Sequence, residues 1–205
     1  MPPRMKFLLS LVGFTIILRL LPYALTTYDV KLDSTTIFYP WNFSPLMAVG
    51  LYSGAFIADR RWKFGLPLLT LFVSDLGIWA VTGQFSWAFQ SDRWSAYLCY
   101  FATVVMGQGL NRQAWPTRAF AALGRGILAE TLFFIVTNFV YFWIQTEYPH
   151  SLAGLIACYV AAIPFAGRSF VSTAFYSVLL FSPLAVGAAG KSTKPEFSLQ
   201  PIRSL

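Results

Sequence analysis

The sequence predicts an all-α integral membrane protein with six transmembrane helices, on the basis of its hydrophobicity, its shortage of charge and its length. Hydrophobic residues make up 57% of the chain, aromatic residues 18% and charged residues 11%. A soluble domain carries about 25% charged residues, and disordered chains are poor in aromatic residues, so both classes are excluded. At about 20 residues per span, 205 residues allow about five to seven spans and no soluble catalytic domain. We expect one transmembrane domain over residues 1–190 and a disordered cytoplasmic tail over residues 191–205.

The first half of the chain contains three expected spans. Arg19 lies inside the first, Phe7–Leu25, and no small-residue cleavage site follows it, so a signal peptide is not expected. The second, Pro45–Ala58, follows Ser44, and serine and proline are favoured at the N-cap and the first helical position. The third is Phe64–Thr82.

The second half supplies three more spans and one shorter apolar segment. The fourth and fifth spans are Ala96–Leu110 and Phe120–Trp143. Leu152–Phe165 is apolar but has only 14 residues and contains Pro164. That length is typical of a re-entrant or interfacial segment. Phe170–Ala189 is long enough to cross and is the sixth expected span.

The basic residues predict the orientation of the bundle. Six spans place ten Lys and Arg residues on one side and three, Lys31, Arg93 and Arg168, on the other. Cytoplasmic loops carry an excess of Lys and Arg, so both termini are expected in the cytoplasm. This asymmetry also explains the net charge of +7 without a nucleic-acid partner. The ten residues are Arg4, Lys6, Arg60, Arg61, Lys63, Arg112, Arg118, Lys191, Lys194 and Arg203.

Four ionisable residues lie within the expected spans: Arg19, Asp75, Arg125 and Glu130. Such a residue at membrane depth costs at least ~2.5–3.5 kcal/mol, so it normally has a partner or a function. Arg19 and Asp75 are expected at matching depths as an ion pair, which either fixes helix packing or lines a ligand cavity. Arg125 is about one turn from the cytoplasmic end and can extend to the headgroups. Glu130 lies near the middle and is the stronger functional candidate of the two.

Polar and aromatic residues gather toward the expected outer side. Thr137 and Asn138 extend a polar stripe from Glu130 along the fifth span. These polar side chains either form an interhelical hydrogen bond or belong to a site. The aromatic residues of the outer loops fit either an interfacial belt or a lid over a pocket. They are Tyr39, Trp41, Phe43, Phe85, Trp87, Phe89, Trp94, Tyr148 and Tyr159.

The sequence offers little for catalysis. His150 is the single histidine, and the motifs of zinc proteases, P-loop ATPases, dinucleotide-binding folds and serine hydrolases are absent from the 205 residues. We therefore expect neither an enzyme nor an ATP site in this chain, and no resident cofactor or metal. Cys99 and Cys158 lie in apolar runs and are expected to be buried thiols, with a disulfide or a ligand-coordinating thiolate as the alternatives.

Five segments together carry a resemblance to a known family. They are RLLP at 19–22, NFSPLMAVGLYSGAF at 42–56, PLLTLFVSDL at 67–76, FFIVTNF at 133–139 and YPHSLAGLIACYVAAIPF at 148–165. The set resembles an uncharacterised family of small bacterial membrane proteins assigned to transport. That family is similar to the S components, the substrate-binding subunits of energy-coupling-factor transporters. The resemblance covers about residues 19–181.

The resemblance implies a protein of the bacterial cytoplasmic membrane with a substrate cavity on its outer side. S components bind vitamins or metal ions, so uptake of a vitamin-like nutrient is implied. Solitary relatives act on cobalamin, which is the leading candidate, and Cys99, Cys158 or His150 would then be weak candidates for a cobalt ligand. An ATP-driven module could dock on small residues spaced by four, which otherwise serve internal packing. These residues are Gly50, Gly54 and Ala58.

These inferences define a candidate site and two alternatives to it. The candidate substrate-binding residues are Arg19, Asn42, Asp75, Trp79, Trp87, Glu130, Asn138, Tyr148 and Tyr159. One alternative is a structural or assembly membrane protein without a ligand, which an outer cavity smaller than a few hundred Å³ would favour. The other is a lipid-modifying intramembrane enzyme, for which the acids would have to converge from different spans.

Overall fold

The computed structural model describes residues 3–27 and 42–188, and all its regular elements in these ranges are helices. The expected tail and the first outer loop, with Lys31, Tyr39 and Trp41, lie outside the described residues. The helices are α1 (Pro3–Thr27), α2 (Leu46–Phe56), α3 (Arg60–Thr82), α4 (Phe85–Ala88), α5 (Arg93–Gly107), the 3-10 turn η1 (Leu110–Arg112), α6 (Thr117–Ile144), α7 (Leu152–Leu180) and α8 (Pro183–Ala188). The predicted all-helical class is confirmed.

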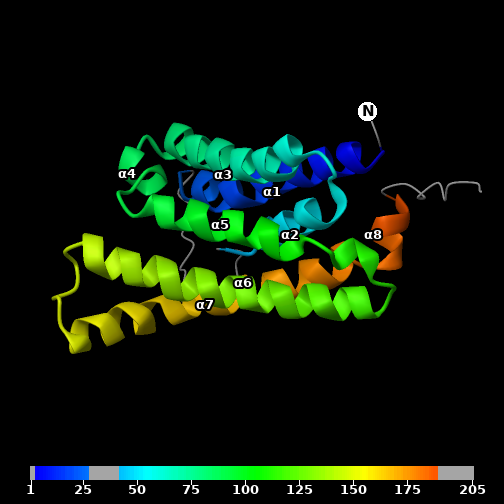
Figure 1. The fold of residues 1–205 in the computed structure, drawn as a ribbon. Coiled ribbons are helices and arrows are strands. Elements are labelled where there is room, and N and C mark those ends of the chain that lie inside the picture. The colour runs from blue at the N-terminus through cyan, green and yellow to red at the C-terminus, as the bar shows by residue number, and fades with distance from the viewer. Residues whose placement is uncertain (1–2, 28–41, 189–205) are drawn as a thin grey trace, which may run out of the picture.

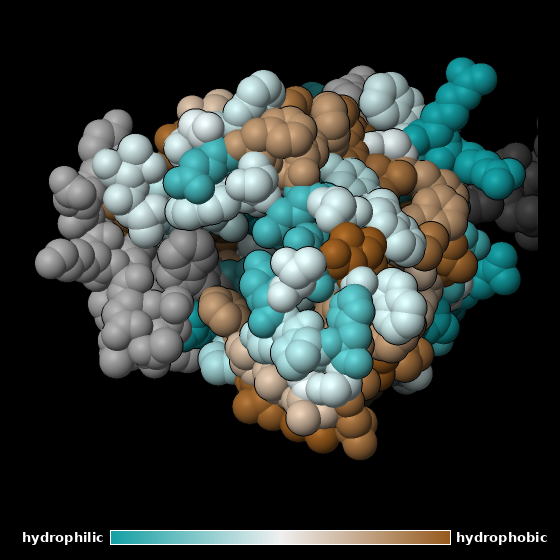
Figure 2. Space-filling model, turned by 90° about the vertical axis from the view of Figure 1, so that its left-hand side faces the viewer, coloured by the Kyte–Doolittle hydropathy of each residue, from teal (hydrophilic) through white to brown (hydrophobic). Residues whose placement is uncertain are grey.

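Four of these helices, α1, α3, α6 and α7, are long and apolar enough to cross a membrane. Their large apolar side chains are often uncovered: Phe120 is 70% exposed and Leu152 is 74% exposed. Figure 2 looks onto the end of the bundle that carries α4, where polar side chains form much of the surface and hydrophobic ones gather along the lower edge. Soluble monomers rarely expose so much apolar surface. The four helices therefore indicate a membrane protein.

The two other expected spans correspond to shorter helices. At 1.5 Å per residue, the 11 residues of α2 reach about 16 Å and the 15 residues of α5 about 22 Å. The hydrocarbon core of a bilayer is about 30 Å thick. Ten of the residues of α2 are buried, so this helix lies inside the bundle, as a helix that is apolar on all sides should.

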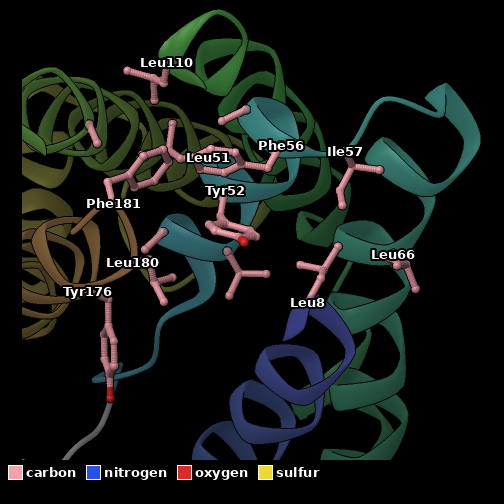
Figure 3. Packing of buried hydrophobic residues seen from close by; sticks show 14 of the residues in the cluster. Leu8, Leu51, Tyr52, Phe56, Ile57, Leu66, Leu110, Tyr176, Leu180 and Phe181 are labelled. Carbon is pink, nitrogen blue, oxygen red and sulfur yellow. The ribbon is translucent and has the colours of Figure 1, made fainter. Parts of the chain in front are cut away.

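The helices form two outer layers around an inner pair. In Figure 1, α1 and α3 lie together above, α6 and α7 lie together below, and α2 and α5 lie between the layers. The side chains of α2 make up much of the main core cluster, where Tyr52 and Phe56 pack against Phe181 (Figure 3). α2 therefore connects the two layers through its buried side chains.

Close contact between α2 and α5 explains the stripe of small residues. A Cβ atom on Gly54 would collide with the carbonyl group of Val104, and one on Gly107 would collide with the carbonyl group of Leu51. Gly50 faces the ring of Tyr100 in the same way. α5 therefore covers Gly50 and Gly54, as the internal-packing alternative expects, whereas Ala58 is exposed.

The expected break between Leu152–Phe165 and Phe170–Ala189 is also wrong. α7 is one continuous helix of 29 residues, with Pro164 inside it, so Arg168 lies within a helix and not in an outer loop. Proline is tolerated in apolar helices when neighbouring groups satisfy the carbonyl that it leaves free. α1 and α3 contain Pro22 and Pro67 without ending there.

Basic side chains converge at the end of the bundle where α1 begins, α2 ends and α6 begins (Figure 1). We call this end the basic end; it carries Arg4, Arg60, Arg61, Lys63, Arg112 and Arg118. The guanidinium groups of Arg4 and Arg118 lie 5.5 and 5.9 Å from the centre of the Phe56 ring. Arg125 reaches this end too, donating to the carbonyl oxygens of Met106 (2.7 Å) and Gln108 (2.8 Å). Positive charge at the carbonyl ends of helices is stabilising.

Candidate functional site

A cavity of about 160 Å³ lies beyond the N-terminal end of α2, on the side away from the basic end. It exists because α2 is short: α1, α5, α6 and α7 continue past the point where α2 begins (Figure 1). Its lining residues are Leu18, Arg19, Pro22, Tyr23, Asn42, Ser44, Leu46, Met47, Leu71, Arg93, Ala96, Tyr100, Glu130, Phe133 and Ser169.

Arg19 and Asp75 form one side of this site and confirm the predicted ion pair. Nη2 of Arg19 lies 3.0 Å from Oδ1 of Asp75. Nη1 of Arg19 donates to the hydroxyl group of Ser74 and, at 3.5 Å, to the carbonyl oxygen of Leu71. Asp75 is fully buried behind the cavity lining, whereas Arg19 is 15% exposed. The carboxylate therefore holds the guanidinium group at the cavity surface.

Arg93 brings a second guanidinium group to the same carboxylate, although the sequence predicts this residue in an outer loop. Nε of Arg93 lies 3.9 Å from Oδ2 of Asp75, which also accepts a 3.0 Å hydrogen bond from the hydroxyl group of Tyr97. Arg93 also donates to the carbonyl oxygens of Ala88 and Trp87, both at 2.9 Å. Arg19, Arg93 and Asp75 together, which we call the arginine wall, carry two positive charges and one negative charge.

Glu130 faces the cavity from the other layer of the bundle. It is 3% exposed, and its Oε1 accepts hydrogen bonds from Thr173 (2.6 Å) and Ser169 (3.2 Å). The partner expected for Glu130 is thus a pair of hydroxyl groups on α7. Among the described residues, no Lys or Arg forms an ion pair with Glu130. We call Glu130, Ser169 and Thr173 the glutamate wall.

The N-terminal end of α2 forms the floor between the two walls. Pro45 is the N-cap residue and supplies no side-chain cap, and the first backbone hydrogen bond of the helix runs from the amide of Val49 to the Pro45 carbonyl at 2.8 Å. The amide groups of Leu46, Met47 and Ala48 therefore have no acceptor among residues 3–27 and 42–188. Such amide groups carry the positive end of the helix dipole. Leu46 and Met47, which carry two of these three amide groups, line the cavity.

Of the predicted site residues, Arg19, Asn42 and Glu130 line the cavity and Asp75 supports it from behind. The remaining predicted residues lie elsewhere. Asn138 donates to the Phe134 carbonyl at 2.7 Å, and the Tyr159 hydroxyl donates to the Ile135 carbonyl at 2.7 Å. The side chains that do not line the cavity are those of Trp79, Trp87, Asn138, Tyr148 and Tyr159.

The three weak candidates for a cobalt ligand also lie outside the cavity lining. Cys99 is buried in α5, and Sγ of Cys158 lies 3.6 Å from the Asn138 carbonyl oxygen. His150 stacks on the ring of Trp143, with the ring centres 5.6 Å apart. In the described part of the chain, no group of three His, Cys, Asp or Glu residues is placed to hold a metal ion.

Residues that sequence reasoning missed are spaced four apart on their helices. Arg93 and Tyr97 are one turn apart on α5, and Ser169 and Thr173 are one turn apart on α7. Residues at this spacing share a helix face. That spacing was a usable signal, but only the fold shows that these two faces point to Asp75 and to Glu130.

Residues 1–194 match the model of a family described as a family of unknown function, DUF6580. The chain belongs to this family. No curated protein and no solved structure matches the chain. A function for this member of DUF6580 is therefore argued from the chemistry of the cavity.

Proposed function

We propose that the protein binds a small polar nutrient in the cavity between the arginine wall and the glutamate wall, as the solute-binding subunit of an uptake system. The observation that carries this proposal is the meeting of Arg19, Arg93 and Glu130 at one cavity inside an otherwise apolar bundle. Ionisable groups at membrane depth are costly and commonly mark the path or the site of a solute. A site that only joined helices would not need three charged side chains facing open space.

The same proposal assigns the orientation. The basic end lies in the cytoplasm, because loops rich in Lys and Arg stay on that side. The cavity then opens away from the cytoplasm, on the outer side of α2. The chain crosses the bacterial cytoplasmic membrane with α1, α2, α3, α5, α6 and α7 as its six crossing elements, α2 serving as a half-length element.

The resemblance to S components supports the transport class, in which a separate ATP-driven module supplies the energy. Such a module would contact the outer, lipid-facing helices, since Gly50 and Gly54 are covered by α5. Uptake without a module, as in a solitary S component, has the same binding site and differs only in the partner.

The size of the cavity favours a small solute. Sites for drug-sized ligands measure about 300–1,000 Å³, whereas this cavity encloses about 160 Å³. Cobalamin is far larger than the usual drug-sized ligand, and none of Cys99, Cys158 and His150 lines the cavity. We therefore favour a compact polar nutrient over cobalamin.

Native mass spectrometry of the protein purified in mild detergent tests this proposal. We expect a bound small molecule that is lost in Glu130→Gln and Arg93→Gln and kept in Glu147→Gln, which changes an exposed acid of the α6–α7 turn. Tryptophan fluorescence provides a second readout, because Trp87 lies 6.2 Å from the ring of Tyr23 at the cavity. Retention of the molecule in both cavity variants would place its site elsewhere.

The small volume also supports a second candidate, a structural or assembly membrane protein that binds no solute. In that case the charged walls would serve only to join the helix layers. Absence of any bound molecule, together with no fluorescence change across a panel of polar nutrients, would favour this second candidate.

A further inference from the structure

We infer that the cavity is built for a small zwitterion, a molecule of the amino-acid class that carries one carboxylate and one ammonium group. This inference rests on the proposed function, because it names the chemical class of the solute. It comes from the charges of the lining together with that of Asp75 behind it, which are separated in space and sum to zero.

The positive side of the cavity is the arginine wall together with the floor. Asp75 balances one of the two guanidinium groups of Arg19 and Arg93, so one positive charge is left. Nη1 of Arg93 has no acceptor among the described residues. The N-terminal end of α2 adds about half a positive charge from its dipole. Guanidinium and free amide groups are the usual partners of a carboxylate in proteins.

The negative side is Glu130. Its Oε1 accepts two hydroxyl groups, and its Oε2 receives no hydrogen bond from the described residues. α1 and α3 hold Arg19 and Asp75, and α6 and α7 hold Glu130 and its partners, so the charges come from layers on opposite sides of the inner helix pair (Figure 1). A carboxylate that is almost fully buried, and that pairs with no Lys or Arg in the described part of the chain, is a suitable partner for an ammonium group.

The balance of charge selects among ligand classes. Arg19, Arg93, Asp75 and Glu130 sum to zero, so an anion or a cation would bring an uncompensated charge into a buried site, which is costly. A zwitterion leaves the sum at zero and pairs with both walls. A neutral polar molecule also leaves the sum at zero, but it pairs Glu130 with no cation.

Binding of matched probes to the purified protein in detergent, measured by calorimetry and tryptophan fluorescence, tests this inference. L-alanine is the zwitterion, L-lactate replaces its ammonium group with a hydroxyl group, and L-alaninamide replaces its carboxylate with an amide. β-Alanine, 4-aminobutyrate and 6-aminohexanoate vary the separation of the two charges. We expect the best zwitterion of the panel to bind about 10- to 100-fold more tightly than the lactate and amide probes, the usual effect of a charged hydrogen bond.

Glu130→Gln makes the test specific, because the amide oxygen can still accept from Ser169 and Thr173. In this variant we expect the preference for the zwitterion over L-lactate to disappear, whereas Glu147→Gln should keep it. Size-exclusion profiles and thermal unfolding show whether each variant is folded, and Glu130→Asp, which keeps the charge, is a second test in which part of the preference should remain.

The possible failures separate the inference from the proposed function. The zwitterion inference is overturned if L-lactate or L-alaninamide binds as tightly as the zwitterion or more tightly. It is also overturned if the preference survives Glu130→Gln. Both results leave the proposal of solute binding intact. A different class of molecule found by native mass spectrometry, with no probe bound, does the same. Absence of any ligand overturns both.

Discussion

Replacing Asp75 with Asn tests whether this carboxylate supports the arginine wall. The change keeps the size of the side chain but removes the charge between Nη2 of Arg19, at 3.0 Å, and Nε of Arg93, at 3.9 Å. Asp75 is fully buried, and the two arginines are only 15% and 24% exposed. Breaking a buried ion pair on one side costs about 3–5 kcal/mol, because a charge is left without its partner. Since both arginines keep some exposure, we expect a loss of about 3 kcal/mol for Asp75→Asn, at the low end of that range.

Reversible unfolding in mixed detergent and SDS measures this loss, and thermal unfolding should show a fall of about 6–12 °C for a chain of this size. Arg19→Gln should cost less, because Asp75 keeps Tyr97 and Arg93 as partners. The double variant should then lose at least about 1 kcal/mol less than the sum of the two single variants, as expected for residues in contact. Additive losses, or a change below about 1 kcal/mol for Asp75→Asn, would refute the view that one carboxylate holds both arginines.

Three further predictions concern the packing of α2, the continuity of α7 and the orientation of the bundle. Gly54→Ala should destabilise the protein by about 3 kcal/mol or more, since the new methyl group meets the Val104 backbone. The control Gly13→Ala has open space around it and should be neutral or stabilising by up to about 1 kcal/mol. Equal unfolding curves for the two variants would contradict the close contact of α2 and α5. A cysteine introduced at Gly167, in a background without Cys99 and Cys158, should resist membrane-impermeant maleimide from both sides, because the position lies within α7; ready labelling from outside would restore the expected loop. Cysteines at Ala58 and Thr146 should be labelled from the cytoplasmic and the outer face respectively, and the reverse pattern would invert the proposed orientation.

The sequence predicted those features that depend on local hydrophobicity and on depth. The bounds of α1, α3 and α6 follow from apolar runs that end at polar or charged residues. The pairing of Arg19 with Asp75 followed from their matching depths in the first and third spans, which run in the same direction. Both inferences need only the chain order and the thickness of a bilayer.

Other features depend on contacts that the chain order does not reveal. The polar stretch before Arg93 predicts an outer loop, yet Arg93 begins α5 and its side chain lies against Asp75. Pro164 predicts the end of an apolar segment, although α7 continues through it. The sequence predicts that α2 is short, but it does not predict the cavity beyond its N-terminal end. That cavity depends on the longer helices that surround α2.

The backbone contacts between α2 and α5 limit how the cavity can change shape. The backbones touch where Gly54 meets Val104 and where Gly107 meets Leu51. These contacts leave no room for one helix to slide past the other, so we expect α2 and α5 to move as one rigid body. The floor of the cavity belongs to α2 and Arg93 belongs to α5, so their separation is fixed. The distances left to vary are those from this pair to the α1–α3 layer, which carries Arg19, and to the α6–α7 layer, which carries Glu130. Entry and exit of a ligand would therefore require motions of the outer helix layers relative to the α2–α5 pair.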